Sequence, residues 1–160
     1  MPIRPADILF VPAEGPVSLG GPIGSRPLAK GLNNLWANMD AETNAEGLSD
    51  HRVMFVRNNH PALTLYNTRL WVEFDGEPAD IAAAVDPHPP AREALAKRID
   101  TPGDSPGLEF TSPSSPGSAL LLGDLAPGEA RAVWFRRTGR NRPAGVEGYS
   151  WVVQGETVDS

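Results

Sequence analysis

Short runs of alternating apolar and polar residues, separated by turn-forming residues, recur along this chain and predict β-strands. The clearest run covers residues 51–57, where Val53 and Phe55 share one face and Met54 and Val56 lie on the other. It ends at an Asn-Asn-His-Pro sequence, which is typical of a turn. We therefore predict a strand that carries apolar side chains on both faces.

Residues 63–74 form the next predicted strand, with Leu70 on one face and Trp71 on the other. Because only a few residues separate it from the first strand, we predict that the two pair as a hairpin. Further strands are predicted at 7–11, 80–85, 108–110, 119–122, 129–138 and 149–154, although the alanines of 80–85 also tolerate a helix. The last two of these have apolar side chains on both faces, so we expect them to lie between the core and another packed element.

Two segments favour helix instead. Residues 91–98 are rich in helix-forming residues and follow Pro89 and Pro90, which suit a helix start. The spacing of Leu32 and Trp36 suits a single helical turn. Residues 101–118 hold many prolines, glycines and serines, which leaves an ordered surface loop and a disordered segment as the alternatives.

Composition narrows the fold class. The chain has 160 residues, enough for about one domain, and its 17 prolines and 16 glycines exclude a helical bundle. We predict an all-β, antiparallel Ig-like β-sandwich of about seven to nine strands with at most one short helix; a small barrel or jelly roll is the alternative. Residues 1–50 are expected to form an irregular N-terminal arm with a short strand, packed on the sandwich or on a neighbour. Residues 51–160 would form the sandwich of a single domain.

Net charge and cysteine content exclude several classes of protein. A formal net charge of −6 argues against a general nucleic-acid binder, which needs basic residues to neutralise phosphates. The absence of cysteine excludes disulfides and thiolate metal sites. An apolar run long enough to span a membrane is missing, and the first residues do not resemble a signal peptide. We expect neither nucleic acid nor a membrane as partner.

Charge is unevenly distributed along the chain. Residues 40–50 and 73–86 contain several acids and no base, whereas residues 131–142 contain only basic charges. These segments are either solvated surface or complementary patches for self-association. The candidate interface residues are the arginines and two tryptophans, namely Trp36, Trp71, Arg131, Arg136, Arg137, Arg140 and Arg142.

Candidate chemistry is sparse. The histidines at positions 51, 60 and 88 lack metal-binding spacing, and no serine lies in a nucleophile-elbow motif. Asp86-Pro87-His88 can bring a carboxylate near an imidazole, but on a proline-rich turn without convergent groups. The acids at 73, 75 and 77 suit either calcium or a solvated strand end. We predict no enzyme, metal or cofactor; a cleft joining His51 or His88 to two acids would reverse that view.

Four tryptophans are many for a chain of this length. Exposed tryptophan on a β-sandwich is a common way to stack sugars, which makes a carbohydrate-binding or adhesion module for host glycans an alternative function. Trp71 and Trp134, however, alternate within strong strands and favour core packing or a protein interface. Trp36 is either a core or lid residue or a partner-facing anchor.

Several segments together resemble a family of small bacteriophage structural proteins. The matching stretches, in chain order, are VSLGGPIG (17–24), Asn34-Leu35-Trp36, HRVMFVRNNHPALTLYNTRLWV (51–72), LLLGDLAPGEARAVWFRRT (120–138) and VQGET (153–157). The chain departs from the family pattern at 76–106, where it is more proline-rich. The resemblance implies an Ig-like virion component of a tailed phage, with no chemistry.

That resemblance sets the expected function. It implies a non-enzymatic structural component of the tail, neck, baseplate or capsid surface, assembled in the bacterial cytoplasm with other virion proteins and copies of itself. A chain without cysteine suits assembly in a reducing cytoplasm. Localisation in the virion is therefore expected, with a host glycan as a further possible partner.

Overall fold

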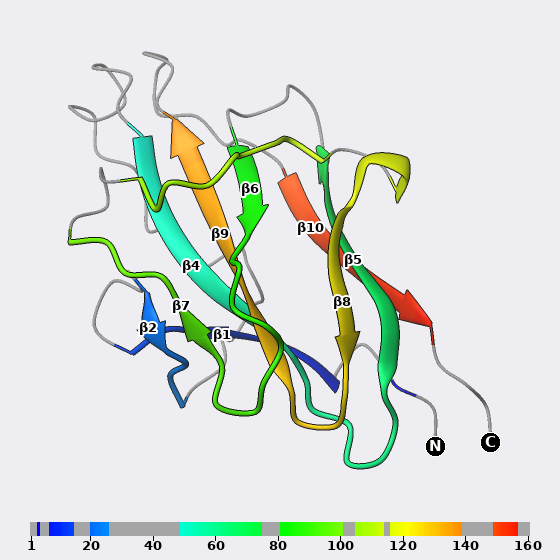
Figure 1. Cartoon of the computed structure of the whole chain (residues 1–160). Helices are drawn as coiled ribbons and strands as arrows, with labels where there is room; N and C mark the ends of the chain where they lie inside the picture. Colours follow the sequence, from blue (N-terminus) through cyan, green and yellow to red (C-terminus); the bar gives the residue numbers. More distant parts are fainter. Residues whose placement is uncertain are drawn as a thin grey trace.

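The computed structural model of the chain describes residues 3, 7–14, 20–25, 49–74, 81–100, 105–113, 116–138 and 149–156 (Figure 1). The strands in this part are β1 (Ile8–Pro12), β2 (Gly21–Pro22), β4 (Ser49–Asn58), β5 (Leu65–Phe74), β6 (Ile81–Val85), β7 (Leu95–Ala96), β8 (Leu120–Leu125), β9 (Ala130–Thr138) and β10 (Tyr149–Glu156). A 3-10 turn, Pro116–Ser118, precedes β8. The described part of the chain is thus an all-β fold, which confirms the predicted fold class.

Two antiparallel sheets face each other. The first sheet has the order β1-β4-β9-β6, and the second has the order β10-β5-β8 (Figure 1). Their facing sides bury one apolar core, because strands with period-two alternation turn one set of side chains inward. The buried members of this core are Met54, Val56, Leu65, Leu70, Ala83, Leu122, Leu125, Val133 and Phe135. The architecture is a β-sandwich.

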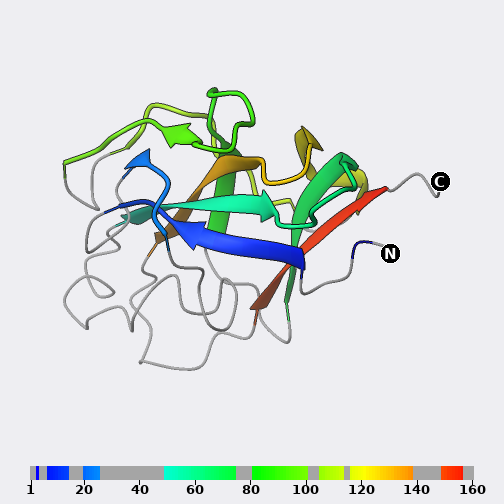
Figure 2. The same ribbon diagram turned by 90° about the horizontal axis from the view of Figure 1, so that it is seen from below.

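The first sheet is also buried on its other side. Val53 and Phe55 of β4, with Ala132 and Trp134 of β9, form a second core outside the sandwich interior. Val11 of β1 extends this core, and the short β2–β7 sheet and the 94–96 segment cover it. Figure 2 shows β1 alongside β4, its partner in the first sheet. The predicted apolar faces of β4 and β9 are therefore confirmed, and both strands lie in a middle layer.

The predicted hairpin between residues 51–57 and 63–74 is wrong. β4 pairs with β1 and β9 in the first sheet, whereas β5 pairs with β10 and β8 in the second. The connection crosses between the sheets because side chains hold it there. Asn58 Nδ2 donates to the carbonyls of Leu63 (2.8 Å) and Leu125 (2.9 Å). The Nδ1 atom of His60 accepts hydrogen bonds from the N–H groups of Ala62 (3.1 Å) and Leu63 (2.9 Å).

The predicted helix at 91–98 is also wrong. Ala91 exchanges two backbone hydrogen bonds with Ala130, at 3.1 and 2.8 Å, and Leu95–Ala96 pairs with Gly21–Pro22. A helix over the same residues would surrender these bonds to β9 and β2. Helix propensity contributes roughly a few tenths of a kcal/mol per residue. Pairing with β9 and β2 therefore outweighs it.

The other strand predictions differ from the structure by a few residues, except that 108–110 is not a strand; Thr111 instead exchanges two hydrogen bonds with Ala83 of β6. Predictions for the turn at 32–36, the acidic stretches at 40–48 and 75–80, and residues 101–104 and 139–148 lie outside the described residues.

Within the described ranges there is no helix of the length and hydropathy needed to span a bilayer.

Candidate functional site

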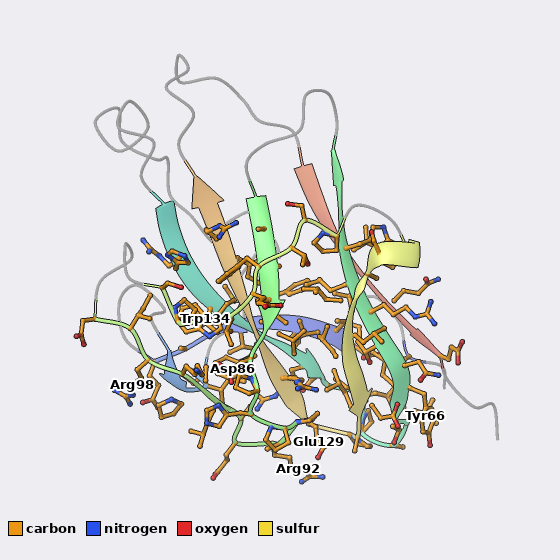
Figure 3. All side chains as sticks on the ribbon, turned by 45° about the horizontal axis from the view of Figure 1, so that its top comes forward. Tyr66, Asp86, Arg92, Arg98, Glu129 and Trp134 are labelled. Atoms are coloured by element: carbon orange, nitrogen blue, oxygen red, sulfur yellow. The ribbon has the colours of Figure 1, made fainter. Side chains whose placement is uncertain are left out.

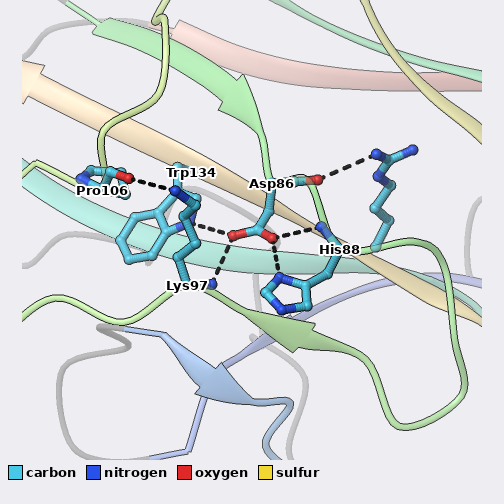
Figure 4. Close-up of polar contacts among 6 residues, drawn as sticks. Asp86, His88, Lys97, Pro106 and Trp134 are labelled. Atoms are coloured by element: carbon cyan, nitrogen blue, oxygen red, sulfur yellow. Dashed lines mark hydrogen bonds and ion pairs between the residues drawn. The ribbon is translucent and has the colours of Figure 1, made fainter.

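The densest polar cluster surrounds Asp86, which follows β6 and has a fully buried side chain. Its Oδ1 accepts the backbone N–H of His88 (3.0 Å) and lies 2.6 Å from the imidazole Nδ1 of the same residue. Its Oδ2 accepts the backbone N–H of Lys97 (2.8 Å) and the indole Nε1–H of Trp134 (2.9 Å) (Figure 4). One carboxylate therefore joins β6, β9 and the residue that directly follows β7.

Local sequence explains half of this arrangement. An aspartate readily accepts the N–H two residues ahead, and Pro87 restricts the turn between Asp86 and His88. The other half comes from the sheet. Register places Trp134 beside Ala84, two residues before the aspartate, so that the indole can reach the carboxylate.

Protonation of Asp86 is set by two opposing effects. Burial acts to raise the pKa of this carboxyl. Hydrogen bonds act in the other direction and together outweigh burial, so the pKa lies below its ordinary value of 3.8. They come from the His88 and Lys97 backbones, the His88 ring and the Trp134 indole. The aspartate is therefore ionised near neutral pH. An ionised buried carboxylate accepts four donors better than a neutral acid, which could accept fewer.

Arg131 of β9 supports the same cluster from the sandwich interior side. It donates from Nη1 to the carbonyl of Leu122 (3.1 Å) and from Nη2 to the carbonyl of Asp86 (3.3 Å). Burial lowers the pKa of this guanidinium, while the charge of Asp86 acts to raise it. Because Leu122 belongs to β8, Arg131 links the edges of the two sheets, where β6 and β8 approach each other (Figure 1).

The Asp86 carboxylate acts mainly as a structural cross-link between the segments that donate hydrogen bonds to it. His88 is 41% exposed and bonded to a carboxylate, an arrangement also used to orient a general base. Here, however, the same carboxylate holds two backbone N–H groups and an indole. Across the described residues, histidine, aspartate and glutamate nowhere gather in a group of three that could hold a metal ion.

A second cluster, of aromatic and charged side chains, lies near the C-terminal end of β9. The Arg136 guanidinium stands 5.0 Å from the centroid of the Phe110 ring, and the His51 ring meets the same phenyl edge-on at 5.5 Å. Arg136 and His51 are paired in register across β9 and β4. Arg136 therefore lies over the ring of Phe110 in a cation–π contact.

The candidate interface residues fare differently. Trp71 is only 6% exposed and the half-buried Arg131 donates to two internal carbonyls, which argues against an interface role for either residue. Arg136 is half-buried against Phe110. Arg137 pairs through its backbone with Asp50 and Ile81, but its side chain is not described. Trp36, Arg140 and Arg142 lie outside the described residues.

Sequence reasoning missed the outer face of the second sheet. Leu121 is 66% exposed on the edge strand β8, and Tyr66 of β5 is 38% exposed. Figure 3 shows Tyr66 well away from Asp86 and Trp134. A signal was present: in three consecutive leucines on a strand, the middle side chain must point away from the other two. Since Leu122 is buried in the core, Leu121 faces outward.

Comparison with known proteins gives no further guide. The chain matches no family model, no curated protein and no solved structure. The resemblance to bacteriophage structural proteins therefore stays a prediction.

Proposed function

We propose that this chain is a non-enzymatic structural component of a tailed bacteriophage particle and acts by assembling with other protein chains. The observation that carries the assembly role is the outer face of the second sheet, where Leu121 and Tyr66 expose large apolar side chains. Large apolar and aromatic side chains exposed on one face of a sheet are a common feature of protein interfaces. The phage setting comes from the sequence stretches that resemble virion proteins.

The polar interior is consistent with this role. Asp86 is the most heavily hydrogen-bonded side chain in the clusters described above, and its partners are the backbones and the indole that it fixes in place. A rigid sandwich with a cross-linked interior suits a protein that must present a constant surface to neighbours. The function is thus attributed to a surface, not to a pocket.

A glycan-binding module is the alternative, and burial makes it harder to sustain. Trp71 and Trp134 are both buried, so neither offers a ring face to a sugar. The alternative would have to rely on the exposed ring of Tyr66 or on aromatic rings outside the described side chains. A glycan array with the purified protein tests it directly, and dose-dependent binding to a defined glycan would favour it.

The proposal is tested on the particle itself. An antibody raised against the purified chain would be used to probe phage particles banded on a density gradient, by quantitative immunoblot and immunogold labelling. We expect the chain at a fixed copy number per particle and gold at one location. Abundant chain in the lysate with none on banded particles would contradict the proposal.

A further inference from the structure

The outer face of the second sheet carries two rows of side chains of opposite character. Register places Arg69 of β5 between Leu121 of β8 and Gln154 of β10. Their neighbours Leu70, Leu122 and Val153 pack in or against the core, so alternation turns this row outward. The first row therefore combines a positive charge with the most exposed leucine of the described residues.

The second row is negative. Asp124 Oδ1 accepts the backbone N–H of Asn67 at 2.9 Å, and Glu156 Oε2 accepts from Asn67 Nδ2 at 3.1 Å. The two carboxylates thus flank Asn67 from β8 and β10, and Glu156 is opposite Tyr66 in register. Asn67 is neutral, so neither carboxylate has its charge compensated by this contact. All three side chains are exposed.

The rows are separated by a position without a large outward side chain. Thr68 is fully buried, and its partner on β8 is Gly123, which has a positive φ of 84°. Side chains therefore project little between the row that contains Leu121 and Arg69 and the row that contains Tyr66 and the two acids. A second sheet with the same arrangement of side chains could approach this face closely.

We propose that this face binds the same face of a second copy of the chain, about a two-fold axis that lies in the interface and runs perpendicular to the strands. Such an axis reverses the strand direction, so the row containing Arg69 lies over the partner's row containing Asp124 and Glu156. A single two-fold rotation therefore forms this pairing of the positive row with the negative row twice. The same axis keeps each strand over the same strand of the partner, so Tyr66 lies over the partner's Arg69 and Leu121 is covered by the partner's β8.

The charge pattern is the reason for choosing a second copy. An unrelated partner could match either row, but the presence of both signs on one face makes the face complementary to itself when reversed. The inference rests on the proposed assembly function, because it names the partner of the surface on which that function depends. It also moves self-association away from the arginine segment at 131–142.

The test uses two charge reversals, R69E and E156R, on the full chain. Each alone opposes like charges across the interface, and we expect the dimer dissociation constant to rise at least about tenfold. Mixed in equal amounts, the two variants form a heterodimer in which both contacts join opposite charges. Sedimentation velocity and native mass spectrometry measure this recovery, which a merely destabilised fold would not give.

A matched pair of leucine variants tests the apolar contact. Leu121→Asp is expected to weaken the dimer at least about tenfold, whereas Leu95→Asp serves as control because Leu95 is 48% exposed on β7, outside the second sheet. Circular dichroism confirms that each variant is folded.

Three results would overturn the inference: a wild-type protein that stays monomeric up to its solubility limit, a dimer indifferent to Leu121→Asp, or charge-reversed variants that fail to form the heterodimer. None of these bears on whether the chain is present on banded particles. Failure of this interface and failure of the proposed function are therefore separable.

Discussion

Replacing Asp86 by asparagine removes the negative charge of the buried cluster but keeps the size and shape of the side chain. Asparagine keeps one carbonyl oxygen but turns the other acceptor into an NH₂ donor. If the NH₂ lies at the Oδ2 position it opposes the N–H of Lys97 and the indole of Trp134; at the Oδ1 position it opposes the N–H of His88. Either orientation leaves at least one buried N–H without an acceptor.

The magnitude follows from these contacts. A hydrogen bond to a charged group contributes about 1.5–3 kcal/mol, and a buried donor left unsatisfied costs about 1–3 kcal/mol. We expect Asp86→Asn to lower the free energy of unfolding by about 3–5 kcal/mol. That is a large part of the roughly 5–15 kcal/mol of a typical domain, and it corresponds to a fall in Tm of roughly 6–20 °C.

Urea unfolding followed by tryptophan fluorescence measures the change. A double-mutant cycle with Trp134→Phe isolates the indole–carboxylate bond, for which we expect a coupling of about 1–3 kcal/mol. A loss below about 1 kcal/mol for Asp86→Asn, with an unchanged m-value, would refute the view that this carboxylate cross-links the fold.

Acid provides an independent check on the same residue. Because the pKa of Asp86 is lower in the folded protein than its ordinary 3.8, the ionised carboxylate stabilises the fold fully above that pH. This contribution is lost as the pH falls below 3.8 toward the folded-state pKa. The stability difference between wild type and Asp86→Asn should therefore shrink in acid, and a difference that stays constant down to the lowest pH would contradict the assignment.

Three further changes test other parts of the fold by denaturant unfolding. Asn58→Ala removes the side chain that holds the crossover between the sheets and should cost about 2–4 kcal/mol; a loss under about 1 kcal/mol would show that the turn holds itself. Gly20→Ala should cost more than about 3 kcal/mol, because φ is 108° and the new Cβ would lie 1.7 Å from the carbonyl oxygen of Lys97. Gly107→Ala, with φ of 77° but open space, is its control at about 1 kcal/mol. Arg131→Met keeps the aliphatic stem, loses both carbonyl contacts and should cost about 1–3 kcal/mol; an unchanged midpoint would remove Arg131 from the link between the sheets.

Local alternation was a reliable guide to faces and a poor guide to partners. It assigned Val53 and Phe55 to one side of β4 and Met54 and Val56 to the other, as the two cores confirm. It could not show that β4 pairs with β9, because a strand's own pattern is the same whichever strand lies beside it. The assumption that neighbours in sequence pair was therefore wrong for β4 and β5.

The same distinction holds at the candidate site. The closeness of Asp86 and His88 follows from their two-residue separation and was anticipated. The donors from Lys97 and Trp134 come from 11 and 48 residues away and depend on how β7 and β9 are placed. Arginine content suggested an external role for Arg131, but a long side chain on a middle strand can equally reach inward.

The middle position of β4 has a consequence for synthesis of the chain. Its partner β9 begins 72 residues after β4 ends, so the pairing of Ser49–Asn58 with Ala130–Thr138 must wait until that stretch has been translated. At about 5–20 residues per second, the delay is about 4–14 s. Throughout it the segment Val53-Met54-Phe55-Val56, apolar on both faces, lacks its longest partner. A nascent chain in this state is a natural client for ribosome-associated chaperones.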